Sequence, residues 1–139
     1  MKDFYHVQYQ KSSSHQFWFV SNGRKNIIKC VQLDVMEANR NYFHLSLLDY
    51  VENSGLLRDN VVSNNGDTLK VLWTVLHCTQ LFLRRFPDAK ITFTGNSISR
   101  DRLFRRQINS NLAAIAEHLQ ILMKDSKNNC IIFNISRRK

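Results

Sequence analysis

The chain has 139 residues, of which 43% are hydrophobic and 22% charged, and its formal net charge is +9. This length and composition indicate one globular domain spanning residues 1–139 and exclude a disordered chain. The apolar runs are far shorter than the roughly 20 residues that cross a bilayer, and residues 1–6 lack the apolar stretch of a signal peptide. We therefore expect a cytoplasmic protein with no membrane partner.

The first third of the chain predicts four antiparallel strands joined by short connections. Alternating or apolar segments place these strands near residues 5–9, 16–20, 27–33 and 42–48. Asn22 and Gly23 favour a tight hairpin turn between the second and third strands, because both residues tolerate positive φ. Residues 49–66 are expected to be irregular.

A long helix is predicted from Asp67, its expected N-cap, to about Arg85. Apolar residues cover most of its circumference, which is typical of a helix packed on several sides. The remaining polar side chains form one narrow stripe of Lys70, Thr74, His77 and Arg84. We expect this helix to be the centre of the fold.

The rest of the chain predicts a strand at 90–94, a loop, a second helix from Ser99 or Arg100, and a closing hairpin of 120–123 and 130–135. The apolar stripe of the second helix is Phe104, Ile108, Leu112, Ile115 and Leu119. The sequence therefore predicts an α+β fold with one largely antiparallel sheet of six to seven strands and two main helices. The predicted order is ββββ-α-β-α-ββ.

Positive charge is concentrated towards the C-terminus. Residues 1–83 hold eight Lys and Arg against seven Asp and Glu, whereas residues 84–139 hold twelve against four. Such asymmetry favours a polyanionic or acidic partner.

The sharpest candidate site is the start of the second helix. Helix N-termini bind anions through free N–H groups, and guanidinium groups suit phosphate. The candidate ligand-binding residues are Gly95, Asn96, Ser97, Ser99, Arg100, Arg102, Arg105 and Arg106. The alternative is a solvated basic face on a helix whose dipole Asp101 already satisfies.

A second candidate patch precedes and follows the start of the first helix, with Asn65, Asp67, Lys70 and His77. Asp67 is a candidate general base or metal ligand there. His77 lies roughly 15 Å further along the helix, too far to share a proton with Asp67. The alternative interpretation is that Asp67 only caps the helix.

Other chemistry has little support. Cys30, Cys78 and Cys130 are widely spaced in apolar sequence, which favours reduced core thiols. The five histidines show no metal-ligand spacing, so no metal and no cofactor are expected. The run 17–19 offers rings for base stacking, although such a run is more often core. No catalytic motif is present, and enzymatic activity is left open.

Two segments carry a resemblance to a known group of proteins: Ser63-Asn64-Asn65-Gly66-Asp67-x-x-Lys70-Val71-Leu72-x-Thr74-Val75 and Gly95-x-Ser97-x-x-Arg100-x-Arg102-Leu103-Phe104. The chain resembles an uncharacterised family of small single-domain bacterial proteins, mostly from Bacteroidota. Trp73 and Phe104 depart from that pattern, where a small residue and a tyrosine are expected. The resemblance implies a bacterial single-domain protein and supplies no activity.

Three functions remain open from the sequence. The first is binding of nucleic acid or another phosphate-rich ligand through the arginine-rich helix start. The second is a protein-interaction module whose basic face meets an acidic partner, such as the product of a neighbouring gene. The third is a phosphate-ester enzyme, which requires Asp67 and the arginines to face one cleft. Oligomeric state is not predicted.

Overall fold

The structure is a computed structural model that describes residues 3–37, 39–51, 56–58, 65–94, 98–117, 119–125 and 131–137. Its strands are β1 (Gln8–Lys11), β2 (His15–Asn22), β3 (Asn26–Met36), β4 (Asn39–Val51), β5 (Leu56–Arg58), β6 (Lys90–Thr94), β7 (Leu119–Asp125) and β8 (Ile131–Arg137). Its helices are α1 (Thr68–Arg85), α2 (Ile98–Ser110) and α3 (Leu112–Ala116). The α+β class and the order ββββ-α-β-α-ββ are confirmed, with the short β5 as an addition.

All the strands join one sheet in the order β1-β2-β3-β4-β6-β8-β7, and β5 pairs with β4 beside this path. Every neighbouring pair is antiparallel except β4 and β6, which run parallel. The edge of β4 that faces away from β3 is shared by two strands. The first half of β4 pairs with β6, and its last residues pair with β5. The predicted hairpin between β2 and β3 is present, but Asn22 is paired with Asn26, so the loop consists of residues 23–25 and Gly23 does not adopt the predicted positive φ.

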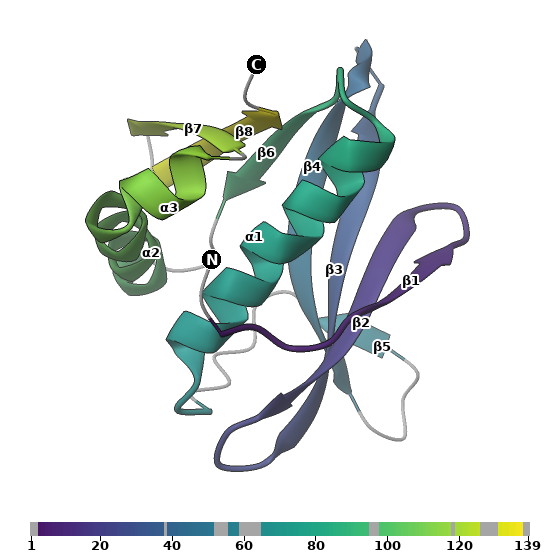
Figure 1. The fold of residues 1–139 in the computed structure, drawn as a ribbon. Coiled ribbons are helices and arrows are strands. Elements are labelled where there is room, and N and C mark those ends of the chain that lie inside the picture. The colour runs from purple at the N-terminus through teal and green to yellow at the C-terminus, as the bar shows by residue number, and fades with distance from the viewer. Residues whose placement is uncertain are drawn as a thin grey trace.

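The helices cover one face of the sheet, with α1 running across its middle and α2 and α3 near β6, β7 and β8 (Figure 1). Inward residues of the strands alternate with exposed ones and form a single core with α1. Ring contacts show that α1 and α2 pack on the same face of the sheet. Phe82 of α1 packs on Phe43 of β4, and Phe104 of α2 packs on Phe93 of β6. No helix within the described ranges is long and apolar enough to cross a membrane.

The structure corrects several of the predicted element boundaries. Leu119, predicted on the apolar stripe of the second helix, is instead the first residue of β7. Residues 49–66 are not wholly irregular, because β4 continues to Val51 and β5 follows. The second helix is interrupted at Asn111, whose side-chain amide donates to Gln107 O at 2.7 Å and whose N–H donates to Ile108 O. The first strand begins at Gln8 rather than Tyr5, because the preceding segment leaves the sheet and passes along α1 (Figure 1).

Candidate functional site

The described part of the first candidate site is the exposed side of α2. Phe104 and Ile108 turn into the core, as the apolar periodicity predicted, and this fixes the direction of the other side chains. Arg102 and Arg106 are exposed, one helical turn apart, and Arg105 is half-buried between them and the core. We call Arg102, Arg105 and Arg106 the basic face of α2.

The remaining residues of that prediction belong to the first turn of α2 and to the segment before it. Gly95, Asn96 and Ser97 lie outside the described residues. Ser99 and Arg100 belong to the first turn of α2, with their side chains outside the description. The basic face alone therefore carries the geometric argument.

The electrostatics of the basic face depend on whether carboxylates neutralise it. Arg105 already interacts with another group of the protein, so it is not counted among the free cations. Neither Arg102 nor Arg106 forms an ion pair with the part of the chain that the structure describes. Their guanidinium groups keep five N–H donors each in a planar fork that suits phosphate or carboxylate oxygens.

The second candidate patch contacts two neighbouring parts of the chain, the β2–β3 hairpin and the N-terminal segment, and Asn65 contacts the hairpin. Its side-chain amide donates to Ser21 Oγ at 3.0 Å and to Lys25 O at 2.8 Å, and its Oδ1 accepts from the Lys25 N–H at 2.9 Å. Its backbone carbonyl accepts from the Arg24 N–H at 2.8 Å. A Cβ on Gly23 would lie 1.7 Å from that carbonyl oxygen, so only glycine allows this approach. Asn65 thus locks the β2–β3 hairpin to the start of α1.

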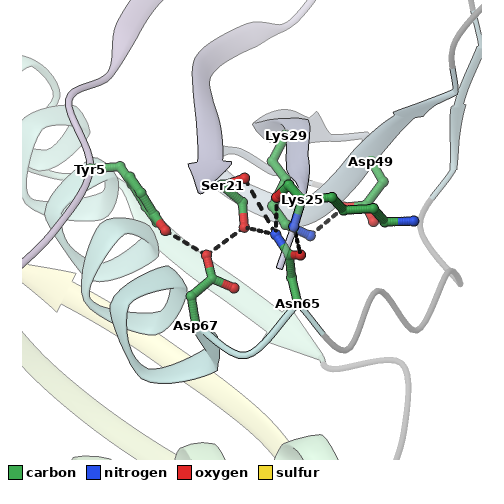
Figure 2. Close-up of polar contacts among 7 residues, drawn as sticks. All are labelled: Tyr5, Ser21, Lys25, Lys29, Asp49, Asn65 and Asp67. Atoms are coloured by element: carbon green, nitrogen blue, oxygen red, sulfur yellow. Dashed lines mark hydrogen bonds and ion pairs between the residues drawn. The ribbon is translucent and has the colours of Figure 1, made fainter. Parts of the chain in front are cut away.

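Asp67 immediately precedes α1, as predicted, but its carboxylate makes no capping hydrogen bond. It accepts instead from the Tyr5 hydroxyl at 2.6 Å and from the Ser21 hydroxyl (Figure 2). The Tyr5 oxygen also accepts from the Asn22 N–H at 3.0 Å. Burial, and after it the hydrogen bond to Asp67, raises the pKa of the Tyr5 hydroxyl, which stays a donor. We call Tyr5, Ser21, Asn65 and Asp67 the polar cluster.

Lys70 contacts the N-terminal segment, along the polar stripe of α1. Its ammonium group lies 4.3 Å from the centre of the Tyr5 ring and 3.5 Å from Asp3. One turn further on, Thr74 Oγ1 accepts from the Tyr5 N–H at 2.9 Å. The N-terminal segment therefore packs on the polar stripe of α1, which it crosses in Figure 1.

His77 continues the same stripe and stacks on Phe4 with ring centres 4.0 Å apart. Burial, and after it the nearby Arg84, lowers the pKa of His77. Asp67 and Lys70 thus meet at Tyr5 and line one pocket, whereas Asn65 faces the hairpin and His77 faces Phe4. Asn65 and Asp67 bind the hairpin, and Asp67, Lys70 and His77 bind the N-terminal segment.

The most buried charges in the described chain are Lys29 and Asp49, which the sequence reading did not single out. They face each other on β3 and β4, on the core side of the sheet, with Lys29 Nζ 2.6 Å from Asp49 Oδ1 (Figure 2). Their side chains are 4% and 10% exposed. The signal was available, because both residues continue the inward alternation of Val31 and Leu47. Two opposite charges at inward positions of adjacent strands indicate a pair.

Both cysteines that the structure describes are free and buried. Burial raises the pKa of the Cys30 thiol to about 12, and burial likewise raises the pKa of Cys78. The thiolate, which is the reactive form, is therefore disfavoured at both positions. This agrees with the predicted core role, and Cys130 lies outside the described residues.

Comparison with known proteins gives one finding that bears on identity. No curated protein matches the chain, and no solved structure does. One family model, described as a family of unknown function (DUF6934), matches residues 1–138. The chain therefore belongs to the DUF6934 family of unknown function.

Proposed function

We propose that this protein binds nucleic acid, or another phosphate-rich ligand, through the basic face of α2. One observation carries the proposal: Arg102 and Arg106 are exposed on adjacent turns and have no ion-pair partner among the described residues. The two residues are about 6 Å apart along the helix axis, at a rise of about 1.5 Å per residue. Two forked donors at that spacing can contact phosphates of one strand at the same time.

The charge distribution supports the same ligand class. Residues 84–139 carry most of the net charge of +9, so the C-terminal part of the chain, which includes α2, attracts a polyanion over long range. Asp67 is bound by Tyr5 and Ser21, not by an arginine. That arrangement supports a binding protein over a phosphate-ester enzyme in which Asp67 and the arginines share a substrate.

Fluorescence anisotropy with labelled single-stranded and duplex oligonucleotides tests the proposal. The Arg102→Ala/Arg106→Ala variant should bind at least about tenfold more weakly, because each charged hydrogen bond contributes roughly 1.5–3 kcal/mol. The slope of log K against log salt should become shallower by about 2 for duplex DNA, since about one counterion is released per phosphate contact.

A matched control removes the same charge elsewhere. Arg24→Ala/Arg40→Ala deletes two exposed arginines of the N-terminal part of the chain and should change affinity much less. Equal affinity of the wild-type protein and the α2 variant for both oligonucleotides would overturn the site. Arginine-dependent binding of polyglutamate without binding of either oligonucleotide would instead indicate an acidic protein partner.

A further inference from the structure

A pocket distant in sequence from the basic face opens where β6, β7 and β8 meet the turn after α1. Its volume is about 630 Å³, within the range of small-molecule sites. Figure 1 shows the end of β8 beside the beginning of β6 in this region. The lining residues are Pro87, Asp88, Ala89, Lys90, Gln120, Ser136 and Arg137.

The sheet aligns several of these side chains in one row. Ser136 of β8 is paired with Lys90 on one side and with Gln120 on the other, so all three point to the same face. Ile91 and Ile135 are buried next to them in sequence, which places the row on the face opposite the helices. An ammonium group, a hydroxyl and an amide are thus held on three adjacent strands about 4.8 Å apart.

The charges of the pocket are not neutralised within it. Lys90 and Arg137 supply two cations and Asp88 one carboxylate. Nevertheless, none of the three forms an ion pair with any described residue. Lys90 lies in the row, whereas Arg137 is paired with the buried Leu119 and reaches the pocket at the end of β8 from the helix side of the sheet. Two exposed cations that line one pocket beside a hydroxyl and an amide suit a phosphate group, and a separate carboxylate suits a hydroxyl donor of the same ligand.

Tyr42 extends the row by one strand. It is paired with Lys90 across the parallel β4 and β6, and its side chain is 41% exposed on the same face. An exposed ring next to a phosphate-binding lysine can stack a nucleobase. We infer that this pocket binds a nucleotide unit, with phosphate at Lys90 and Arg137, sugar hydroxyls at Asp88 and the base on Tyr42.

This inference does not rest on the proposed function of α2, and separate variants test the two sites. The experiment is an amide-resolved NMR titration of the full chain with AMP, ribose 5-phosphate and inorganic phosphate. AMP should shift the amide signals of Lys90, Gln120 and Ser136. Lys90→Ala/Arg137→Ala should weaken AMP and ribose 5-phosphate by at least about tenfold, because it removes two charged contacts to phosphate.

Tyr42→Ala separates a nucleotide from a plain phosphate. It should weaken AMP by about tenfold, the loss expected for one base stack, and leave ribose 5-phosphate unchanged. Lys11→Ala/Arg24→Ala removes one exposed lysine and one exposed arginine outside both proposed sites, so it is the matched control and should bind AMP as the wild-type protein does. All substituted side chains are exposed, and the dispersion of the NMR spectrum reports whether each variant is folded.

A short single strand with or without a 5′ phosphate identifies the source of the nucleotide. Binding of AMP upholds a free nucleotide as ligand. Binding of the strand alone, weakened by Lys90→Ala/Arg137→Ala, upholds a nucleotide unit within a strand. Absence of shifts at the row with every probe would overturn the inference, and so would AMP binding that is unchanged by Lys90→Ala/Arg137→Ala.

Discussion

The start of α1 and the exposed side of α2 both gather polar side chains, but they differ in where the hydrogen-bonding groups point. In the polar cluster, Asn65 and Asp67 bind other parts of the chain, and Ser21 is fully buried between them. On the basic face, Arg102 and Arg106 point to solvent without an ion-pair partner in the described chain.

This difference separates residues that build the fold from residues available for a ligand. A buried polar group must be satisfied internally, because an unpaired one costs about 1–3 kcal/mol. An exposed guanidinium group without a protein partner costs little folding free energy, because water accepts its hydrogen bonds. Substitutions in the polar cluster should therefore lower the free energy of unfolding. Substitutions on the basic face should lower the affinity for the ligand and leave the stability nearly unchanged.

The largest expected effect is at Lys29, beside the polar cluster. Lys29→Ala leaves the Asp49 carboxylate buried without its ammonium partner and should lower the free energy of unfolding by about 3–5 kcal/mol. Urea denaturation followed by circular dichroism measures this change. A loss below that expected for an exposed pair, about 1 kcal/mol, would contradict a buried ion pair.

Two variants sharpen this test. Lys29→Met/Asp49→Leu removes both charges and should recover much of the loss, because apolar side chains of similar size replace the pair. Asp3→Ala breaks the exposed pair with Lys70 and should cost less than about 1 kcal/mol.

The next effect is at Gly23, where the hairpin meets Asn65. Gly23→Ala places a Cβ 1.7 Å from Asn65 O, so the backbone must separate and the hydrogen bonds of Asn65 to Arg24 and Lys25 are lost. We expect a loss of about 3 kcal/mol in the free energy of unfolding, measured by thermal or urea denaturation. Asn65→Ala should destabilise by a similar amount and, combined with Gly23→Ala, add little. Full additivity would contradict a shared contact.

Stability should also fall at mildly acidic pH. Burial, then Lys11 and Arg85, lowers the pKa of His15, and burial lowers the pKa of His77. As pH falls below about 6.5, the unfolded chain binds protons that the folded chain does not, so the free energy of unfolding decreases. Above that pH the full stability is present.

Denaturation curves between neutral and mildly acidic pH measure this slope. The His15→Gln/His77→Gln variant should have a shallower slope than the wild-type protein, and His44→Gln, at an exposed site, is the matched control. A slope that the double variant leaves unchanged would assign the acid sensitivity to other groups.

The smallest effect on stability should come from the basic face. Arg102→Ala/Arg106→Ala removes no described ion pair, so the free energy of unfolding should change by within about 0.5 kcal/mol per site. The same variant should lose affinity for oligonucleotides. A large loss of stability would show that the two arginines stabilise the fold, as the polar cluster does.

Local pattern was enough to identify most of the elements. Alternation located β2, β3 and β4, because strand period acts over a few residues. Asn22-Gly23 located the β2–β3 hairpin but not its turn type, because Gly23 is required by the close approach of Asn65 and not by a positive φ. The apolar circumference of α1 predicted its central place, and Phe104 and Ile108 predicted the inward side of α2. These features depend on neighbours in sequence, and the exposed position of Arg102 and Arg106 follows from them.

The sequence by itself determined the α+β class, the order of the main elements, the central place of α1 and the orientation of α2. Only the tertiary structure decided the roles of Asp67, Lys70 and His77, because their partners Ser21, Tyr5 and Phe4 lie more than 40 residues away. It also decided the row of Tyr42, Lys90, Ser136 and Gln120, which needs the register of four strands at once. Hydrogen-bond partners and strand register depend on residues far apart in sequence, so they cannot be predicted from the spacing of residues along the chain.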